Sequence, residues 1–125
     1  MRPLVHFTGR PSRLAAQIES SKIFAKEFFR RHGIATAQAI VCGSKPDAEA
    51  AIRQLGFPCV LKADGLAGGK GVLVAESKED GERAISLFFQ ERVFGAGGDR
   101  ILVEEFLDGT EVSFLSVCDG QTAVP

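Results

Sequence analysis

Residues 58–75 read PCVLKADGLAGGKGVLVA, and this stretch decides the fold class. The segments 58–63 and 71–75 are apolar and rich in residues that favour β-structure, so both are predicted to be strands. The glycine-rich segment DGLAGGK joins one strand directly to the other. The sequence therefore predicts a β-hairpin whose connection is a glycine-rich lid over one end of the sheet.

The segments on either side of this hairpin predict an α+β domain. Capping residues and apolar periodicity predict helices over residues 12–19, 21–33, 44–56 and 77–92. Further strands are predicted over 36–42, 100–106 and 111–118, with a flexible loop at 94–99. Because strands follow one another in pairs, the sheet is predicted to be mostly antiparallel. Residues 1–10 have no clear period and are interpreted as a lead-in.

Composition and charge exclude several classes of protein. Fifteen Lys and Arg against sixteen Asp and Glu give a net charge of −1, which argues against a dedicated nucleic-acid-binding or acidic-membrane-binding protein. No apolar run approaches the roughly 18 residues of a membrane span, and no secretory signal is recognised, so a cytoplasmic location is expected. Cys42, Cys59 and Cys118 lack metal-site spacing and are predicted to be reduced core or strand thiols.

The loop composition is typical of a phosphate-binding loop, because glycine lets backbone N–H groups approach an anion closely. Two common phosphate motifs do not fit. Asp64 replaces the first glycine of a Walker A sequence and Gly71 replaces its final Ser or Thr, and the dinucleotide spacing fails as well. Both motifs also join a strand to a helix, whereas this loop joins two strands. A merely flexible hairpin turn remains the alternative.

Lys62 lies within an apolar strand, where a lone charge is costly unless it faces solvent or an anion. Alternation places Cys59, Leu61 and Ala63 on one face, and Lys62 on the other with Val60 and Asp64. Lys62 could therefore bind a phosphate at the mouth of the lid. The alternative is a salt bridge with Asp64 or a neighbouring carboxylate.

Glu104 and Glu105 end the strand predicted at 100–106. Adjacent carboxylates on a strand face opposite sides, so they cannot act as one catalytic pair. One of them could face a ligand, and the strand end could offer a backbone N–H and C=O pair to an adenine edge. The alternative is that both are solvated charges at an edge.

Three stretches together, SKIFAKEFFRRHGIATA, PCVLKADGLAGGKGVLVA and ILVEEFLDGTEVSFLSVCDG, resemble the ATP-grasp region of the glycinamide ribonucleotide synthetase family. The resemblance runs from about residue 11 to 125. It implies a helical segment at 11–35, an ATP-grasp small subdomain at 36–106 and the start of a larger subdomain at 107–125. Residues 1–10 do not resemble the family.

The resemblance also implies a role for individual residues. Lys22 and Lys62 match lysines that contact ATP phosphates, and the loop over those phosphates comprises Gly65, Leu66, Ala67, Gly68, Gly69, Lys70 and Gly71. The adenine side comprises Glu104, Glu105, Phe106 and Leu107, where a glutamate side chain or backbone carbonyl takes the amino group and the Leu107 N–H reaches the ring. Glu111 matches a carboxylate that binds the ribose hydroxyls.

The function implied is that of an ATP-binding fragment of a ligase. The parent enzyme would join glycine to 5-phosphoribosylamine and convert ATP to ADP and phosphate, with Mg²⁺ ligands beyond the end of this chain and no catalytic or metal-ligating residue within it. Two alternatives remain: another ATP-grasp carboxylate–amine ligase, such as one making carboxyaminoimidazole ribonucleotide, or a nucleotide-binding or interaction module without catalysis. An assay for product separates an enzyme from a module.

Overall fold

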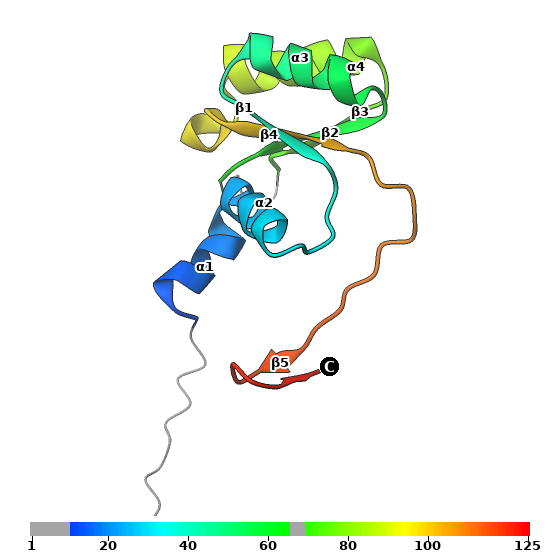
Figure 1. Cartoon of the computed structure of the whole chain (residues 1–125). Coiled ribbons are helices and arrows are strands. Elements are labelled where there is room, and N and C mark those ends of the chain that lie inside the picture. The colour runs from blue at the N-terminus through cyan, green and yellow to red at the C-terminus, as the bar shows by residue number, and fades with distance from the viewer. Residues whose placement is uncertain (1–10, 66–69) are drawn as a thin grey trace, which may run out of the picture.

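The computed structural model describes residues 11–65 and 70–125 and contains a four-stranded antiparallel sheet with helices on both faces. The strands are β1 (Ala39–Cys42), β2 (Cys59–Ala63), β3 (Val72–Ala75) and β4 (Ile101–Glu105), in the order β1-β4-β2-β3. Helices α3 (Lys45–Leu55) and α4 (Lys78–Ile85) lie on one face of the sheet, and α2 (Lys22–Arg31) lies on the other (Figure 1). The predicted α+β class is confirmed.

The helices begin and end where the capping residues predict. Ser21, Ser44 and Ser77 each accept a backbone N–H at the start of α2, α3 and α4, and Ser77 forms a reciprocal capping box with Asp80. Gly33 follows α2 with φ 64°, and Gly56 ends α3 with φ 80°. The first helix, α1 (Arg13–Ser20), precedes α2 and contains no buried residue.

The core lies between the sheet and helices α3 and α4. Cys59, Leu61 and Ala63 of β2 have no exposed surface, and they pack in one cluster with Ile52 of α3 and Ile85 of α4. The alternation predicted for β2 is therefore confirmed, because these three residues share the helix-covered face. Gly81 lies close to this cluster: a Cβ atom at this position would lie 3.2 Å from Ile52 Cδ1 and 3.3 Å from Phe57 Cε1, a tight contact that these side chains would have to relieve.

Several predicted elements are wrong in part. Residues 94–99, predicted as a flexible loop, contain the 3₁₀ helix η2 (Gly95–Gly98), in which Gly98 is buried. The helix predicted to reach residue 92 changes to the π-helix η1 (Ser86–Gln90) after Ile85. The strand predicted over 36–42 begins only at Ala39. The lead-in at 1–10 lies outside the described residues.

The largest difference concerns the strand predicted over 111–118. Only Val117–Cys118 (β5) is a strand, and it pairs with Ala123–Val124 (β6) rather than with β4. The physical reason is topological: β4 is already bonded to β1 on one side and β2 on the other, so it offers no free edge to the segment that follows it. Residues 107–116 instead form an extended segment leading away from the sheet (Figure 1).

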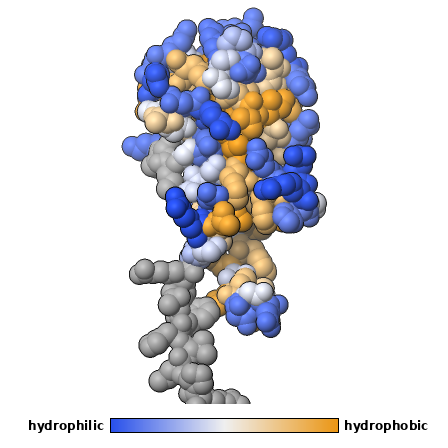
Figure 2. Space-filling model, turned by 60° about the vertical axis from the view of Figure 1, so that its left-hand side comes forward, coloured by the Kyte–Doolittle hydropathy of each residue, from blue (hydrophilic) through white to orange (hydrophobic). Residues whose placement is uncertain are grey.

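The surface carries exposed hydrophobic side chains on both the sheet domain and this C-terminal segment. Figure 2 shows a hydrophobic strip running down one side of the molecule between hydrophilic margins. Within the C-terminal segment, Val112, Phe114 and Leu115 are each about four-fifths exposed. None of the helices among the described residues is long and apolar enough to cross a membrane.

Candidate nucleotide-binding site

The sheet face opposite α3 and α4 carries a buried carboxylate held by two lysines. Glu104 of β4 is opposite Val60 in the ladder, so its side chain lies on the same face as that of Lys62, and Lys62 Nζ donates to Glu104 Oε2 at 2.8 Å. Lys26 Nζ of α2 lies 3.5 Å from Oε1, and the Glu104 side chain is 4% exposed. Two ammonium groups around one carboxylate leave a net positive charge beside the sheet.

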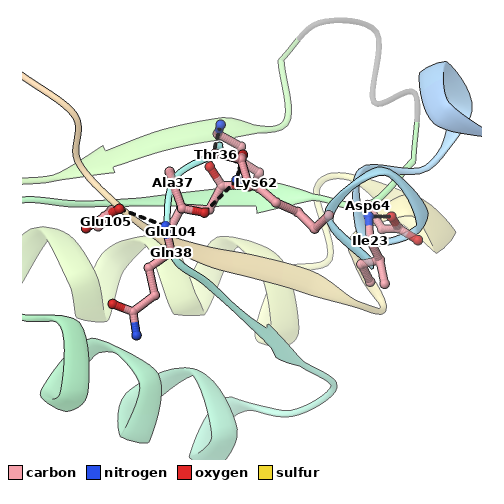
Figure 3. Close-up of polar contacts among 9 residues, drawn as sticks. Ile23, Thr36, Ala37, Gln38, Lys62, Asp64, Glu104 and Glu105 are labelled. Atoms are coloured by element: carbon pink, nitrogen blue, oxygen red, sulfur yellow. Dashed lines mark hydrogen bonds and ion pairs between the residues drawn. The ribbon is translucent and has the colours of Figure 1, made fainter. Parts of the chain in front are cut away.

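Lys26 also connects α2 to the segment that leads into β1. Its Nζ donates to Thr36 Oγ1 at 2.6 Å and to the Ala37 carbonyl at 2.8 Å. Figure 3 shows Thr36, Ala37, Lys62 and Glu104 gathered in one place. Lys26 was not among the residues predicted from the sequence. Lys26 lies four residues after Lys22 and therefore on the same side of the helix, and this spacing could have identified it as a candidate site residue.

The second lysine predicted from sequence, Lys22, lies at the foot of the glycine-rich loop. Its Nζ donates to the Gly65 carbonyl at 3.3 Å, and its backbone N–H donates to the Asp64 carbonyl at 3.3 Å. Asp64 Oδ1 accepts a hydrogen bond from the Ile23 N–H at 2.9 Å (Figure 3). It also accepts one from Ser21 Oγ at 2.9 Å. A carboxylate at the positive end of α2 is favourable and fixes the helix to the loop.

These contacts identify the partner of Lys62 in this structure. Its partner is the neighbouring carboxylate of Glu104, whereas Asp64 binds the N-terminus of α2. The Lys62 side chain is nevertheless 30% exposed, so it is not fully enclosed by this contact. The alternative in which both glutamates are solvated edge charges is wrong for Glu104, which is buried.

Backbone hydrogen bonds fix the start of the glycine-rich loop to the segments on either side of it. The Asp64 N–H donates to the carbonyls of Gly97 and Arg100, each at 3.1 Å, and the Ala63 N–H donates to the Gly71 carbonyl at 2.7 Å. A Cβ atom on Gly65 would lie 3.3 Å from Gly97 Cα, so η2 and the loop meet at two glycines. Within residues 94–99 only Gly98 is buried, and it lies beside Phe88 and Phe94.

The predicted lid lies only partly within the described residues. Leu66, Ala67, Gly68 and Gly69 lie outside them. Lys70 is exposed, Gly71 is buried, and β3 starts directly afterwards at Val72. Because β2 and β3 pair antiparallel, the loop joins two strands as predicted, and a strand-to-helix phosphate motif is excluded.

The end of β4 has an unusual bonding pattern. The Glu105 N–H donates to the Gln38 carbonyl at 3.0 Å, while the Gln38 N–H donates to Glu105 Oε1 at 2.8 Å (Figure 3). Phe106 and Leu107 follow and are 43% and 65% exposed. Glu111 lies on the exposed extended segment, and no contact among the described residues joins it to Glu104 or to the two lysines that hold Glu104.

The cysteines, among the remaining titratable groups, do not add to this site. Cys42 and Cys59 are buried thiols, and Cys118 is exposed. Burial, together with the nearby Asp47 charge, raises the pKa of Cys42 to about 11, and burial raises the pKa of Cys59. No group of three or more His, Cys, Asp or Glu side chains in residues 11–65 and 70–125 is placed to hold a metal ion.

Two hollows lie on opposite faces of the domain. One of about 460 Å³ lies between α2 and the start of β1, beside Lys26, Gln38 and Leu102. The other, of about 590 Å³, lies between α3 and α4, beside Ile52 and Phe57, and none of the predicted site residues lines it. The polar contacts therefore place the candidate site on the α2 face, even though the larger hollow is elsewhere.

Comparisons with known proteins identify relatives of this chain. Residues 20–125 match the family model of the phosphoribosylglycinamide synthetase ATP-grasp (A) domain. The chain is 49% identical over 114 residues to a phosphoribosylamine–glycine ligase of Ralstonia nicotianae, covering 91% of this chain and 27% of that protein. It is 52% identical over 116 residues to the human trifunctional purine biosynthetic protein adenosine-3, covering 92% of this chain and 12% of that protein.

A solved structure agrees with these relatives. The crystal structure of a phosphoribosylamine–glycine ligase from Thermotoga maritima superposes with a TM-score of 0.79 at 36% identity, covering 90% of this chain and 31% of that one. The chain thus spans about a quarter to a third of the single-function ligases that it matches. Since the family model covers most of the chain, the chain belongs to the phosphoribosylglycinamide synthetase family and contains part of its ATP-grasp domain.

Proposed function

We propose that this chain is the ATP-binding part of a ligase that joins glycine to 5-phosphoribosylamine while converting ATP to ADP and phosphate. One observation carries the proposal: in a chain of this family, Lys22 Nζ contacts the Gly65 carbonyl at the start of a glycine-rich hairpin loop, and Lys62 lies on the strand that leads into the same loop. Lysines placed in this way around a loop of this composition suit the phosphates of a nucleotide, and the names of the relatives supply the reaction.

The phosphates of ATP would contact the lysines and the loop. Lys22 and Lys62 would donate to phosphate oxygens, and Lys70 would add a further charge from the loop. The loop backbone from Gly65 to Gly71, including Leu66, Ala67, Gly68 and Gly69, would supply N–H donors. This arrangement neutralises negative charge where it develops during phosphoryl transfer.

The base and ribose would lie toward the end of β4. Both carboxylate oxygens of Glu104 already face lysines, which favours a backbone carbonyl, that of Glu105, as the acceptor of the adenine amino group. The Leu107 N–H would donate to the ring, and Phe106 would lie between these two backbone contacts. Glu111 would bind the ribose hydroxyls if the extended segment folds against the nucleotide.

The reaction needs no covalent nucleophile on the protein. A carboxylate oxygen of glycine attacks the γ-phosphorus of ATP, the bond to the bridging oxygen breaks, and ADP leaves. The amine of phosphoribosylamine then attacks the acyl carbon, loses a proton and releases phosphate. The residues of this chain would bind and orient ATP, and positioning of this kind contributes several kcal/mol to catalysis.

Magnesium supports phosphoryl transfer by neutralising phosphate charge when it is bound. The carboxylates of the candidate site do not suit it. Glu104 is held by two lysines, and no contact among the described residues joins Glu111 to Glu104 or to these lysines. We therefore assign magnesium ligands, and the binding of glycine and phosphoribosylamine, to parts of a longer protein.

The domain division is also part of the proposal. Residues 11–35 would lead into a small subdomain at 36–106, and residues 107–125 would begin a larger subdomain. The exposed hydrophobic side chains of Val112, Phe114 and Leu115 support this division, because such residues are normally covered in a folded protein. A cytoplasmic location would suit an enzyme that uses these metabolites.

The test is a product assay on two proteins. One is expressed with all the sequence that its gene encodes, and the other is the 125-residue chain alone. Each is incubated with ATP, magnesium, glycine and phosphoribosylamine. The longer protein is expected to form glycinamide ribonucleotide, and the 125-residue chain is expected to form none. Nucleotide binding without product from either protein would favour a non-catalytic module. A different amide product would favour another carboxylate–amine ligase.

A further inference from the structure

The hydrogen bonds between Gln38 and Glu105 depart from a regular ladder. In an antiparallel sheet, a hydrogen-bonded pair of residues exchanges two bonds, each N–H donating to the carbonyl of the other residue. The Glu105 N–H follows this rule and donates to the Gln38 carbonyl at 3.0 Å. The Gln38 N–H does not return to the Glu105 carbonyl. It donates to Glu105 Oε1 at 2.8 Å.

The carboxylate of Glu105 therefore takes the place of its own backbone carbonyl. A bond from an N–H to an ionised carboxylate is stronger than one to a neutral carbonyl, so the exchange is favourable. It leaves the Glu105 carbonyl as an acceptor at the last residue of β4, two residues before Leu107. This end of the strand is where the sheet would present a carbonyl and an N–H to the edge of a base.

We infer that the Glu105 side chain is a positioning residue for adenine specificity: by holding the Gln38 N–H, it keeps the Glu105 carbonyl available to the adenine amino group. The inference rests on the proposed function. Adenine presents an amino donor at this edge, whereas hypoxanthine presents a carbonyl oxygen that would face the Glu105 carbonyl without a hydrogen between them. The side chain thus promotes discrimination between ATP and inosine triphosphate without touching either base.

The test compares two substitutions in the protein expressed with all the sequence that its gene encodes. Glu105→Gln keeps an amide oxygen that can accept the Gln38 N–H, whereas Glu105→Leu removes the acceptor and lets that N–H turn to the backbone carbonyl. Dissociation constants for ATP and inosine triphosphate are measured by titration calorimetry. In Glu105→Leu, the constant for ATP should rise about fivefold, the effect of one hydrogen bond, and that for inosine triphosphate should stay within twofold.

Glu105→Gln is the matched control and should retain most of the discrimination. Equal weakening of both nucleotides in Glu105→Leu would mean that the side chain supports only the fold, and equal losses in the two variants would mean that its charge matters rather than its acceptor. Either result overturns the inference, as does a wild-type protein that binds both nucleotides equally. A wild-type protein that binds neither nucleotide contradicts the proposed function itself.

Discussion

The face of the sheet beneath α3 and α4 carries Cys59, Leu61 and Ala63 of β2 without exposed surface, whereas the opposite face carries Val60 and Lys62 of the same strand. The covered face contains the hydrophobic cluster. The other face contains a buried glutamate between two lysines and, on β3, the half-exposed Val72 and Val74. Stability therefore rests mainly on the covered face, whereas the proposed nucleotide site lies on the other. Both are possible on one strand because successive side chains point to opposite faces.

Leu61→Ala should give the largest effect, because Leu61 is fully buried in the cluster. The free energy of unfolding should fall by about 3 kcal/mol, the usual cost of a truncated core leucine and the cavity left behind. Val74→Ala is the matched control on the other face, where the side chain is 48% exposed, and it should cost less than about 1 kcal/mol. Urea denaturation measures both, and similar losses would contradict the division between the faces.

The covered face should also make stability sensitive to alkaline pH. The folded state keeps the Cys42 thiol protonated up to a pKa of about 11, whereas the thiol of the unfolded chain ionises near its ordinary value. Above about pH 9 the unfolded state binds fewer protons, so stability falls as the pH rises, by about 2 kcal/mol up to pH 11. Urea denaturation at several pH values measures this slope.

The matched variant for the pH slope is Cys42→Ala. It removes the thiol, and so the decline in stability above pH 9 should be smaller than in the wild type, although Cys59, whose pKa is also raised by burial, should leave some slope. A constant difference between the two proteins at every pH would show that the ionisation of Cys42 contributes nothing.

On the polar face, Lys26→Met should lower the free energy of unfolding by roughly 1–2 kcal/mol, because it removes a charged partner from a buried carboxylate. Part of the interaction survives, since Lys62 still contacts Glu104. Lys45→Met is the control: the Lys45–Glu49 pair is exposed, and its loss should cost less than about 0.5 kcal/mol. Thermal unfolding of both variants checks the difference. Equal melting temperatures would show that the contact between Lys26 and the buried Glu104 adds no more stability than an exposed ion pair.

Local signals predicted the elements and the covered face well. Ser21, Ser44 and Gly56 act through hydrogen bonds or backbone angles within a few residues, so their effect is visible in the sequence. The alternation of 59–63 follows from the strand period alone. The hairpin was predictable for the same reason, because its two strands are neighbours in the chain.

Contacts between distant segments were not predictable in this way. The central place of β4, between β1 and β2, fills both of its edges and prevents the hairpin expected with residues 111–118. Asp64 binds the start of α2, 41 residues earlier in the chain at Ile23, and η2 lies against Gly65. Such partners are set by topology, which the pattern of a single segment does not contain.

The smallest effect is expected at the strand end of the polar face. Leu107→Pro removes the backbone N–H that would reach the adenine ring, so the dissociation constant for ATP should rise about fivefold, the effect of one hydrogen bond. Leu107 is 65% exposed, so the melting temperature should change little. Leu107→Met keeps the N–H and should bind ATP nearly as the wild type does. Calorimetric titration measures both variants, and equal weakening would show that the side chain, rather than the backbone donor, contacts the nucleotide.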